Sequence, residues 1–324
     1  MKRGILAAAG GTLALAVLVI LFVRAVGNAP PGTFDRLRSA HGLPIVLGTL
    51  LIFAGQAARG VRLELLLPKG ERIGLVRSAA LAGASTFLLQ IVPFRGGEVA
   101  SFALYRRILG VSWTRSAAVF VLVKVVDGAA ILIIGLFGAA HIAHRRGEAL
   151  LADAVVVAAA LAVLGLVALP AAGTAALLWL LPRLPEGSRR RRAALELVAG
   201  LRVAREEPWA YLLALSGALT HLTIHILGLK TVLSGLGLEV SFGTLAFSAL
   251  ASVLTAAFIP SPAGTFGSAE TGFAGALALD GIPVPLGVAA GAAAHVSMVL
   301  AAGLAGLPIA WEILARRRAS DREG

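Results

Sequence analysis

The chain alternates long apolar segments with short polar ones. The apolar stretches cover residues 4–26, 43–58, 75–92, 116–140, 150–181, 208–232, 241–259, 265–279 and 284–314. Several are continuous over the ~20 residues that a helix needs to cross a bilayer. Residues 75–92 and 265–279 are shorter. The pattern predicts an all-α polytopic membrane protein, with residues 1–324 forming a single integral membrane domain.

Basic residues decide which stretches cross. If all of them crossed, the Arg-rich segments 95–115, 183–205 and 316–322 would lie outside, against the positive-inside rule. The alternative is that residues 75–105 and 241–279 are re-entrant hairpins, one entering from each face. Most of the 29 Lys and Arg residues then lie on the inside, Arg59 and Arg62 among them. We therefore predict about six to seven full spans, two re-entrant hairpins and cytoplasmic termini.

A weak internal repeat supports this arrangement. The first hairpin turns at residues 93–98 and the second at residues 260–270, and each turn has Pro, then Gly, then Glu. Because the hairpins enter from opposite faces, the two halves would be related by inverted topology, as in many secondary transporters. The alternative is that Gly and Pro only kink ordinary spanning helices.

Composition agrees with a membrane protein. The chain is 58% hydrophobic and 14% charged, with a mean hydropathy of +0.89. Its net charge of +12 flanks apolar runs, which indicates topology signals and anionic lipid headgroups rather than nucleic acid. The run from Gly4 is too long for a signal peptide, so we expect a retained first helix. The abundance of Arg, Ala and Gly suggests a bacterial inner (cytoplasmic) membrane protein.

The basic segment 182–208 contains four consecutive arginines and then an Ala/Leu-rich stretch. It predicts a cytoplasmic surface helix on anionic lipid. A solvated charged linker is the alternative.

Ionisable residues within apolar segments are costly, so they are candidates for function. They are Arg95, Glu98, Lys124, Asp127 and Glu270. Lys124 and Asp127 are three residues apart, so they share a helix face and can pair. Arg95 and Glu98 follow a Pro in a Gly-interrupted turn, where a guanidinium and free N–H groups could bind an anionic headgroup. The alternative is that these charges form structural ion pairs.

The second turn offers the hydroxyl of Ser261 and backbone donors around Gly264. His221 and His225 lie one helical turn apart, a spacing that can bind metal, but only His295 could supply a third ligand. We expect polar packing or a proton relay there, and neither a metal nor a cofactor. The chain has no Cys, and no Walker, Rossmann, G-x-S-x-G or H-E-x-x-H motif.

The segment PFRGGEVASFALYRRILGVSWTRSAAVFVLVKVVD, which begins at Pro93, resembles the membrane domain of lysylphosphatidylglycerol synthases and its stand-alone, flippase-like relatives. The second turn, IPSPAGTFGSAE, is similar to a later Gly-rich turn of that family. The resemblance covers about residues 5–312. Ser101 stands where the family often has Arg, and Val123 and Lys124 replace Glu-Arg. The matching positions are Pro93, Arg95, Gly97, Glu98, Asp127, Pro262, Gly264 and Glu270.

The resemblance implies a protein that moves a lipid between leaflets. The expected substrate-binding residues are Arg95, Gly97, Glu98, Lys124, Asp127, Ser261, Gly264 and Glu270. The expected partners are anionic or polyprenyl-phosphate-type lipids, and a second copy of the chain or a nearby transferase are further candidates. No aminoacyl-transferase domain follows Arg318, so we do not expect lipid aminoacylation or other catalysis. Two alternatives stay open: an enzyme acting on a lipid-linked substrate, and a non-catalytic membrane partner of a glycosyl- or aminoacyl-transferase.

Overall fold

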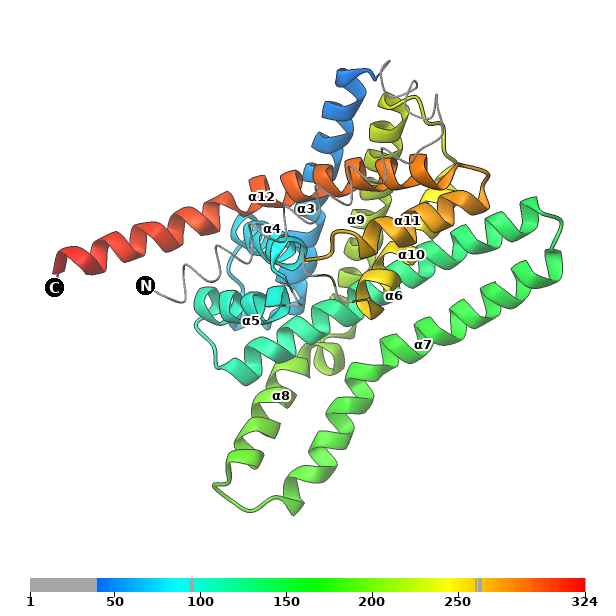
Figure 1. Ribbon diagram of the computed structural model, residues 1–324. Coiled ribbons are helices and arrows are strands. Elements are labelled where there is room, and N and C mark those ends of the chain that lie inside the picture. The colour runs from blue at the N-terminus through cyan, green and yellow to red at the C-terminus, as the bar shows by residue number, and fades with distance from the viewer. Residues whose placement is uncertain (1–39, 94–95, 260, 262–263, 324) are drawn as a thin grey trace.

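The structure, a computed structural model, describes residues 40–93, 96–259, 261 and 264–323. The predicted first helix at residues 4–26 therefore lies outside the described residues, as do Arg95 and Pro262. The described chain is built from α-helices (Figure 1). They are α3 (Gly42–Leu66), α4 (Leu75–Ile91), α5 (Gly96–Leu109), α6 (Trp113–Arg145), α7 (Ala149–Leu180), α8 (Arg189–Glu206), α9 (Pro208–Gly235), α10 (Phe242–Phe258), α11 (Ser268–Leu279) and α12 (Val284–Glu323).

Five of these helices are long enough and apolar enough to cross a membrane: α3, α6, α7, α9 and α12. α3 and α9 pack side by side, and α12 crosses them (Figure 1). α6 and α7 form a long antiparallel pair, and α7 is largely exposed along its apolar length. In a membrane protein that exposed apolar surface faces lipid. The prediction of an all-α polytopic membrane protein is confirmed.

Local sequence explains where several helices begin. Ser112 and Ser241 are N-caps of α6 and α10, and their hydroxyls accept hydrogen bonds from the backbone N–H groups of Arg115 and Thr244. α9 starts with Pro208, whose missing N–H costs nothing in the first turn. These short polar signals divide a nearly continuous apolar sequence into separate helices.

Four helices are too short to cross alone. α4 and α10 have 17 residues each, α5 has 14 and α11 has 12. At about 1.5 Å per residue the longest of them reaches about 26 Å, less than the ~30 Å of a hydrocarbon core. α4 packs on α5, and α10 packs on α11, so they form two helical hairpins. A side chain at Gly97 would collide with the backbone of Leu88, so only glycine lets α5 lie this close to α4.

Polar contacts show that the two hairpins open at opposite ends of the molecule. The loops that flank the α4–α5 hairpin are joined by an ion pair between Glu71 and Arg115. The open end of the α10–α11 hairpin is bound through Asp280, which accepts from the Thr244 hydroxyl at 2.8 Å and pairs with Arg145 at 3.1 Å. Arg115 and Arg145 lie at opposite ends of α6, so the open ends face opposite ways.

Each hairpin has its own apolar core. The first core surrounds α4 and α5 with residues of α3, α6 and α9, and in it the ring of Phe120 meets Phe102 edge-on, with centroids 4.6 Å apart. The second core surrounds α10 and α11 with residues of α9 and α12. The buried residues of the two cores are different, and the cores meet at Leu219 and Leu222 of α9, which pack against both.

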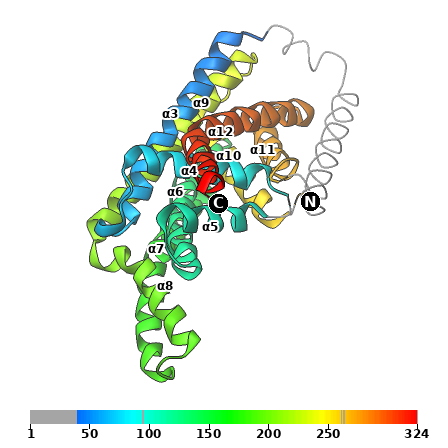
Figure 2. The ribbon, with the colours of Figure 1, turned by 90° about the vertical axis from the view of Figure 1, so that its left-hand side faces the viewer.

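Two helix boundaries differ from the sequence predictions. The apolar stretch ends at residue 58 but α3 continues to Leu66, so Arg59 and Arg62 lie within the helix. The apolar residues Val61, Leu63 and Leu66 continue the helix past both arginines, and Arg62 itself is buried. The first hairpin ends at Leu109 rather than near residue 105. The basic segment does form a helix, α8, which projects with α7 from the rest of the molecule (Figure 2).

The end-to-end arrangement predicts a labelling pattern. The chain has no native Cys, so each single-cysteine variant has one reactive thiol. Glu148→Cys and Pro283→Cys should react with an impermeant maleimide from one side of the membrane, because their loops lie at one end of the helices. Arg107→Cys and Glu186→Cys should react only from the other side. Labelling of Glu148→Cys and Glu186→Cys from the same side would contradict this arrangement.

Candidate functional site

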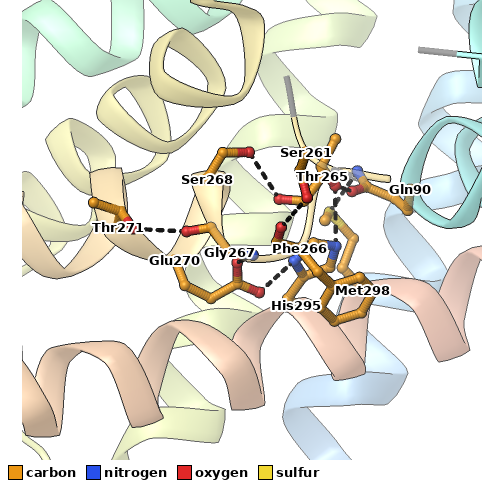
Figure 3. Close-up of polar contacts among 10 residues, drawn as sticks. All are labelled: Gln90, Ser261, Thr265, Phe266, Gly267, Ser268, Glu270, Thr271, His295 and Met298. Carbon is orange, nitrogen blue, oxygen red and sulfur yellow. Dashed lines mark hydrogen bonds and ion pairs between the residues drawn. The ribbon is translucent and has the colours of Figure 1, made fainter. Parts of the chain in front are cut away.

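The tips of the two hairpins meet. The backbone N–H of Thr265, in the loop between α10 and α11, donates to the carbonyl oxygen of Gln90 at 3.1 Å, and the Thr265 hydroxyl donates to the Gln90 side-chain oxygen (Figure 3). Gly264 makes this approach possible. Its φ is +73°, and a Cβ there would overlap the carbonyl oxygen of Gln90. Two segments about 175 residues apart thus share backbone and side-chain hydrogen bonds.

A buried carboxylate shapes the second tip. Glu270 is 6% exposed, and its Oε2 accepts from the backbone N–H of Gly267 at 2.6 Å. Its Oε1 lies 2.6 Å from Nδ1 of His295 on α12, which is 4% exposed. The His295 ring stacks on Phe266, with centroids 3.8 Å apart, and its Nε2 lies 3.2 Å from the Thr265 hydroxyl. Glu270 therefore connects the start of α11 to α12 and, through His295, to the tip contact.

Ser261 belongs to the same loop. Its hydroxyl donates to the carbonyl oxygen of Phe266 at 2.6 Å, and the Ser268 hydroxyl donates to the carbonyl oxygen of Thr265 at 3.1 Å (Figure 3). These bonds hold the loop in shape within the hairpin. The loop hydroxyls are thus part of the geometry that presents Thr265 to the first hairpin.

A second polar group lies beside the first hairpin. Arg62 of α3, whose side chain is 3% exposed, forms an ion pair with Asp127 of α6. Arg59, one turn earlier on α3, donates to the hydroxyl of Thr86 on α4. The two arginines therefore join α3 to α6 and to α4 respectively. We call Arg59, Arg62, Lys124 and Asp127 the cationic cluster.

Lys124 has a different partner from the one expected. The spacing predicted a pair with Asp127, but the ion pair that Asp127 makes within the described residues is with Arg62. The Lys124 ammonium lies 5.2 Å from the centroid of the Phe120 ring. Lys124 and Glu98 are both exposed, and the Glu98 carboxylate attracts the Lys124 ammonium. The positive charges of Arg59 and Arg62 repel it. Lys124 lies roughly 17 Å along α6 from Trp113, within the apolar part of this candidate spanning helix.

Ser101 and Tyr105 place uncharged polar groups on the inner face of α5. Ser101 is fully buried, and its hydroxyl donates to the carbonyl oxygen of Ser85 at 3.3 Å. Tyr105 is 2% exposed, and its hydroxyl lies near the side chain of Ser85. Position 101 thus holds a small neutral group, and among the described residues the positive charges that act on Tyr105 are Arg59 and Arg62 of α3.

The histidines do not gather. His221 Nδ1 lies 2.9 Å from the carbonyl oxygen of Gly55, and its ring centroid is 5.9 Å from that of His225. His295 pairs with Glu270 instead. Across the described part of the chain, no three His, Asp or Glu side chains lie close enough together to hold a metal ion.

The structure sorts the predicted site residues into two groups. Glu98, Lys124 and Asp127 lie by the first hairpin, and Ser261, Gly264 and Glu270 form the second tip. Gly97 serves close packing of α5 on α4. Arg95 is outside the described residues.

The sequence interpretation missed Arg59, Arg62, Gln90 and Thr265, and it considered His295 only as a metal ligand. The two arginines carried a usable signal, since they are three residues apart within an apolar helical pattern. Gln90 and Thr265 carried none, because a single amide and a single hydroxyl are common in such segments.

The close approach of the tips predicts that Gly264→Ala lowers stability. Alanine must adopt a strained backbone conformation, which costs about 1–3 kcal/mol, and its Cβ overlaps the Gln90 carbonyl. The thermal midpoint of the purified protein, followed by size-exclusion chromatography after heating, should fall. Gly275→Ala in α11 is the matched control, because nothing lies within 4 Å of that position and alanine favours the helix. An unchanged midpoint for Gly264→Ala would argue against the tip contact.

The buried ion pair predicts a larger effect for Asp127→Asn. Removing the carboxylate leaves the Arg62 guanidinium buried without a counter-charge, which costs about 3–5 kcal/mol. The same heating assay should show a marked loss, largely reversed in the double variant Arg62→Leu/Asp127→Leu. Glu186→Gln is the control, because its partner Arg191 is met at the surface and the Glu186 side chain is 92% exposed. Equal effects of Asp127→Asn and Glu186→Gln would contradict the pairing.

Comparison with known proteins gives one family. The model of the lysylphosphatidylglycerol synthase TM region matches residues 5–306 of the 324 residues. Neither the curated proteins nor the solved structures include a match to this chain. The matched range contains both hairpins, the tip contact and the cationic cluster. The chain is a multi-pass membrane protein that belongs to the lysylphosphatidylglycerol synthase TM region family, a family connected with the handling of membrane lipids.

Proposed function

We propose that this protein transports a lipid with an anionic or phosphate-bearing headgroup from one leaflet to the other by alternating access. One observation carries the proposal: two short hairpins that open at opposite ends of the molecule touch at their tips, through Thr265 and Gln90. A contact of this kind can separate two compartments. Membership of a lipid-related family supports a lipid as the substrate.

In this proposal the hairpins are re-entrant and the halves are an inverted repeat. α4, α5, α10 and α11 are each shorter than a hydrocarbon core, so each hairpin is expected to enter and leave on one face. Non-helical backbone at such depth is tolerated where protein or water surrounds it. Transporters with inverted repeats place their substrates where broken helices meet near the midplane.

Basic residues suggest the orientation. The end with Arg77, Arg115 and the α8 arginines is proposed to face the cytoplasm, by the positive-inside rule. Both termini would then be cytoplasmic, the first hairpin would open inward and the second outward. The proposed location is the inner membrane of a bacterium.

The structure has its tips in contact, which suits an occluded state. Rupture of the Thr265–Gln90 bonds would let one hairpin move away from the other, while its separate apolar core keeps it intact. The Glu270–His295 pair keeps the second tip in shape during this movement. Opening inward and outward in turn would give a headgroup access to each leaflet.

A disulfide lock tests the proposal. Gln90→Cys/Thr265→Cys introduces the only two thiols in the chain, at positions that already contact each other. In proteoliposomes with fluorescent phosphatidylglycerol, the wild type should move lipid between leaflets faster than empty vesicles do. The oxidised variant should fall to the empty-vesicle rate, and a reductant should restore movement. Dithionite quenching of the outer-leaflet fluorophore measures both rates.

A second disulfide is the control. Ser112→Cys/Glu196→Cys joins the start of α6 to α8, where the Ser112 hydroxyl donates to Glu196 at 2.7 Å, away from the tips. Its oxidation should leave transport unchanged. Wild-type protein that moves neither phosphatidylglycerol nor a fluorescent polyprenyl phosphate faster than empty vesicles would refute the proposal. Conversion of the lipid to a new product, seen by mass spectrometry, would favour an enzyme instead.

A further inference from the structure

The cationic cluster and Glu98 do not balance in charge. Arg59, Arg62 and Lys124 bring three positive charges, and Asp127 and Glu98 bring two negative ones. One positive charge is left over even when both carboxylates are counted. His221 and His225 act electrostatically with Arg59, but histidine is neutral or positive and cannot supply the missing negative charge. Among helices apolar enough to cross a membrane, such an excess is unfavourable without a counter-ion.

The cluster also lacks hydrogen-bond acceptors. Within the described residues, the buried Nε atoms of both Arg59 and Arg62 have no partner. Buried guanidinium N–H groups normally donate hydrogen bonds, so the two Nε atoms without a partner indicate a missing acceptor. The side-chain oxygen of Gln56, one turn before Arg59 on α3, lacks a donor in the same way. A ligand with a hydroxyl or ammonium group beside its negative charge would satisfy both kinds of atom.

Accessibility divides the cluster into two layers. Lys124 is exposed and Arg59 is partly exposed, whereas Arg62 is buried. Arg62 neutralises Asp127, so this carboxylate does not repel an approaching anion. The outer layer can therefore meet a ligand, and the inner ion pair supports it.

We propose that Arg59 and Lys124 bind one phosphodiester group of a lipid headgroup, with Arg62 as the positioning residue that neutralises Asp127. A phosphodiester carries one negative charge, which matches the single excess positive charge, and its oxygens supply an acceptor for the Arg59 guanidinium. Both ligand contacts come from spanning helices, α3 and α6, rather than from the hairpin turns. The assignment rests on the proposed lipid transport for its substrate class.

Lipid retention tests this site. The full chain is purified in detergent, incubated with equal amounts of phosphatidylglycerol and diacylglycerol, and examined by native mass spectrometry. The wild type should retain phosphatidylglycerol in preference to diacylglycerol, which has no phosphate. Arg59→Gln and Lys124→Gln should each weaken that retention roughly ten- to hundred-fold, because each removes a charged hydrogen bond. Lys124→Arg should keep it.

Two further variants separate binding from general damage. Lys230→Gln removes an exposed lysine near the far end of the spanning helix α9 and should bind like the wild type. Glu98→Gln removes the carboxylate that attracts Lys124, so phosphatidylglycerol retention should rise. A loss of binding caused by misfolding could not produce this rise. The elution volume and helical circular dichroism of each variant should match the wild type.

The outcomes are distinct. Retention of phosphatidylglycerol by both Arg59→Gln and Lys124→Gln at the wild-type level would overturn the site, and so would equal retention of diacylglycerol by the wild type. Binding of inorganic phosphate in a calorimeter, with the same dependence on the variants and no lipid retention, would overturn the lipid source. Retention without transport would refute the proposed transport and leave this site standing. If Arg59→Gln and Lys124→Gln both leave transport intact, the binding site is refuted and the proposed transport stands.

Discussion

The structure depends on one constraint, which is that backbone polar groups inside a bilayer must find partners within the protein. A helix that ends at membrane depth leaves its last carbonyls and its first N–H groups unpaired. At the tips these groups satisfy each other. The carbonyl of Gln90, at the end of α4, accepts from Thr265, and Glu270 accepts the free N–H of Gly267 before α11. The tip contact thus pairs backbone groups that the end of α4 and the start of α11 leave open, as the proposed re-entrant hairpins require.

The same constraint explains why the charges divide into two sites. At the second tip the carboxylate of Glu270 is occupied by the backbone N–H of Gly267 and by His295, so this side is an internally satisfied hydrogen-bond network. Beside the first hairpin, Arg59, Arg62 and Lys124 outnumber their counter-charges, and two guanidinium Nε atoms lack partners among the described residues. The network at the second tip suits a contact that opens and closes. The excess positive charge beside the first hairpin suits a bound anion.

Periodicity and charge in the sequence were enough to predict the membrane class and the two helical hairpins, since long apolar runs and Pro/Gly breaks are local properties. Glu270, Gly264 and Asp127 were recognised because a charge or a turn glycine inside an apolar segment is unusual. Their partners were not recognised, because the Asp127–Arg62 ion pair and the Gly264–Gln90 contact join distant parts of the chain. The end of α3 was set too early, since arginines after an apolar stretch resemble the flank of a helix, although Val61, Leu63 and Leu66 continue it.

The two sites are coupled through α4. Arg59 donates to Thr86 on this helix, and Gln90, one turn further on, receives the second tip. An anion at the proposed site would share the Arg59 guanidinium with the Thr86 hydroxyl, so its binding would act on a group that contacts α4 one turn from the tip contact. A helix transmits such a change along its axis because its residues move together. The proposed headgroup site and the tip contact therefore share one helix, which gives the proposed transport a physical route from headgroup binding to hairpin separation.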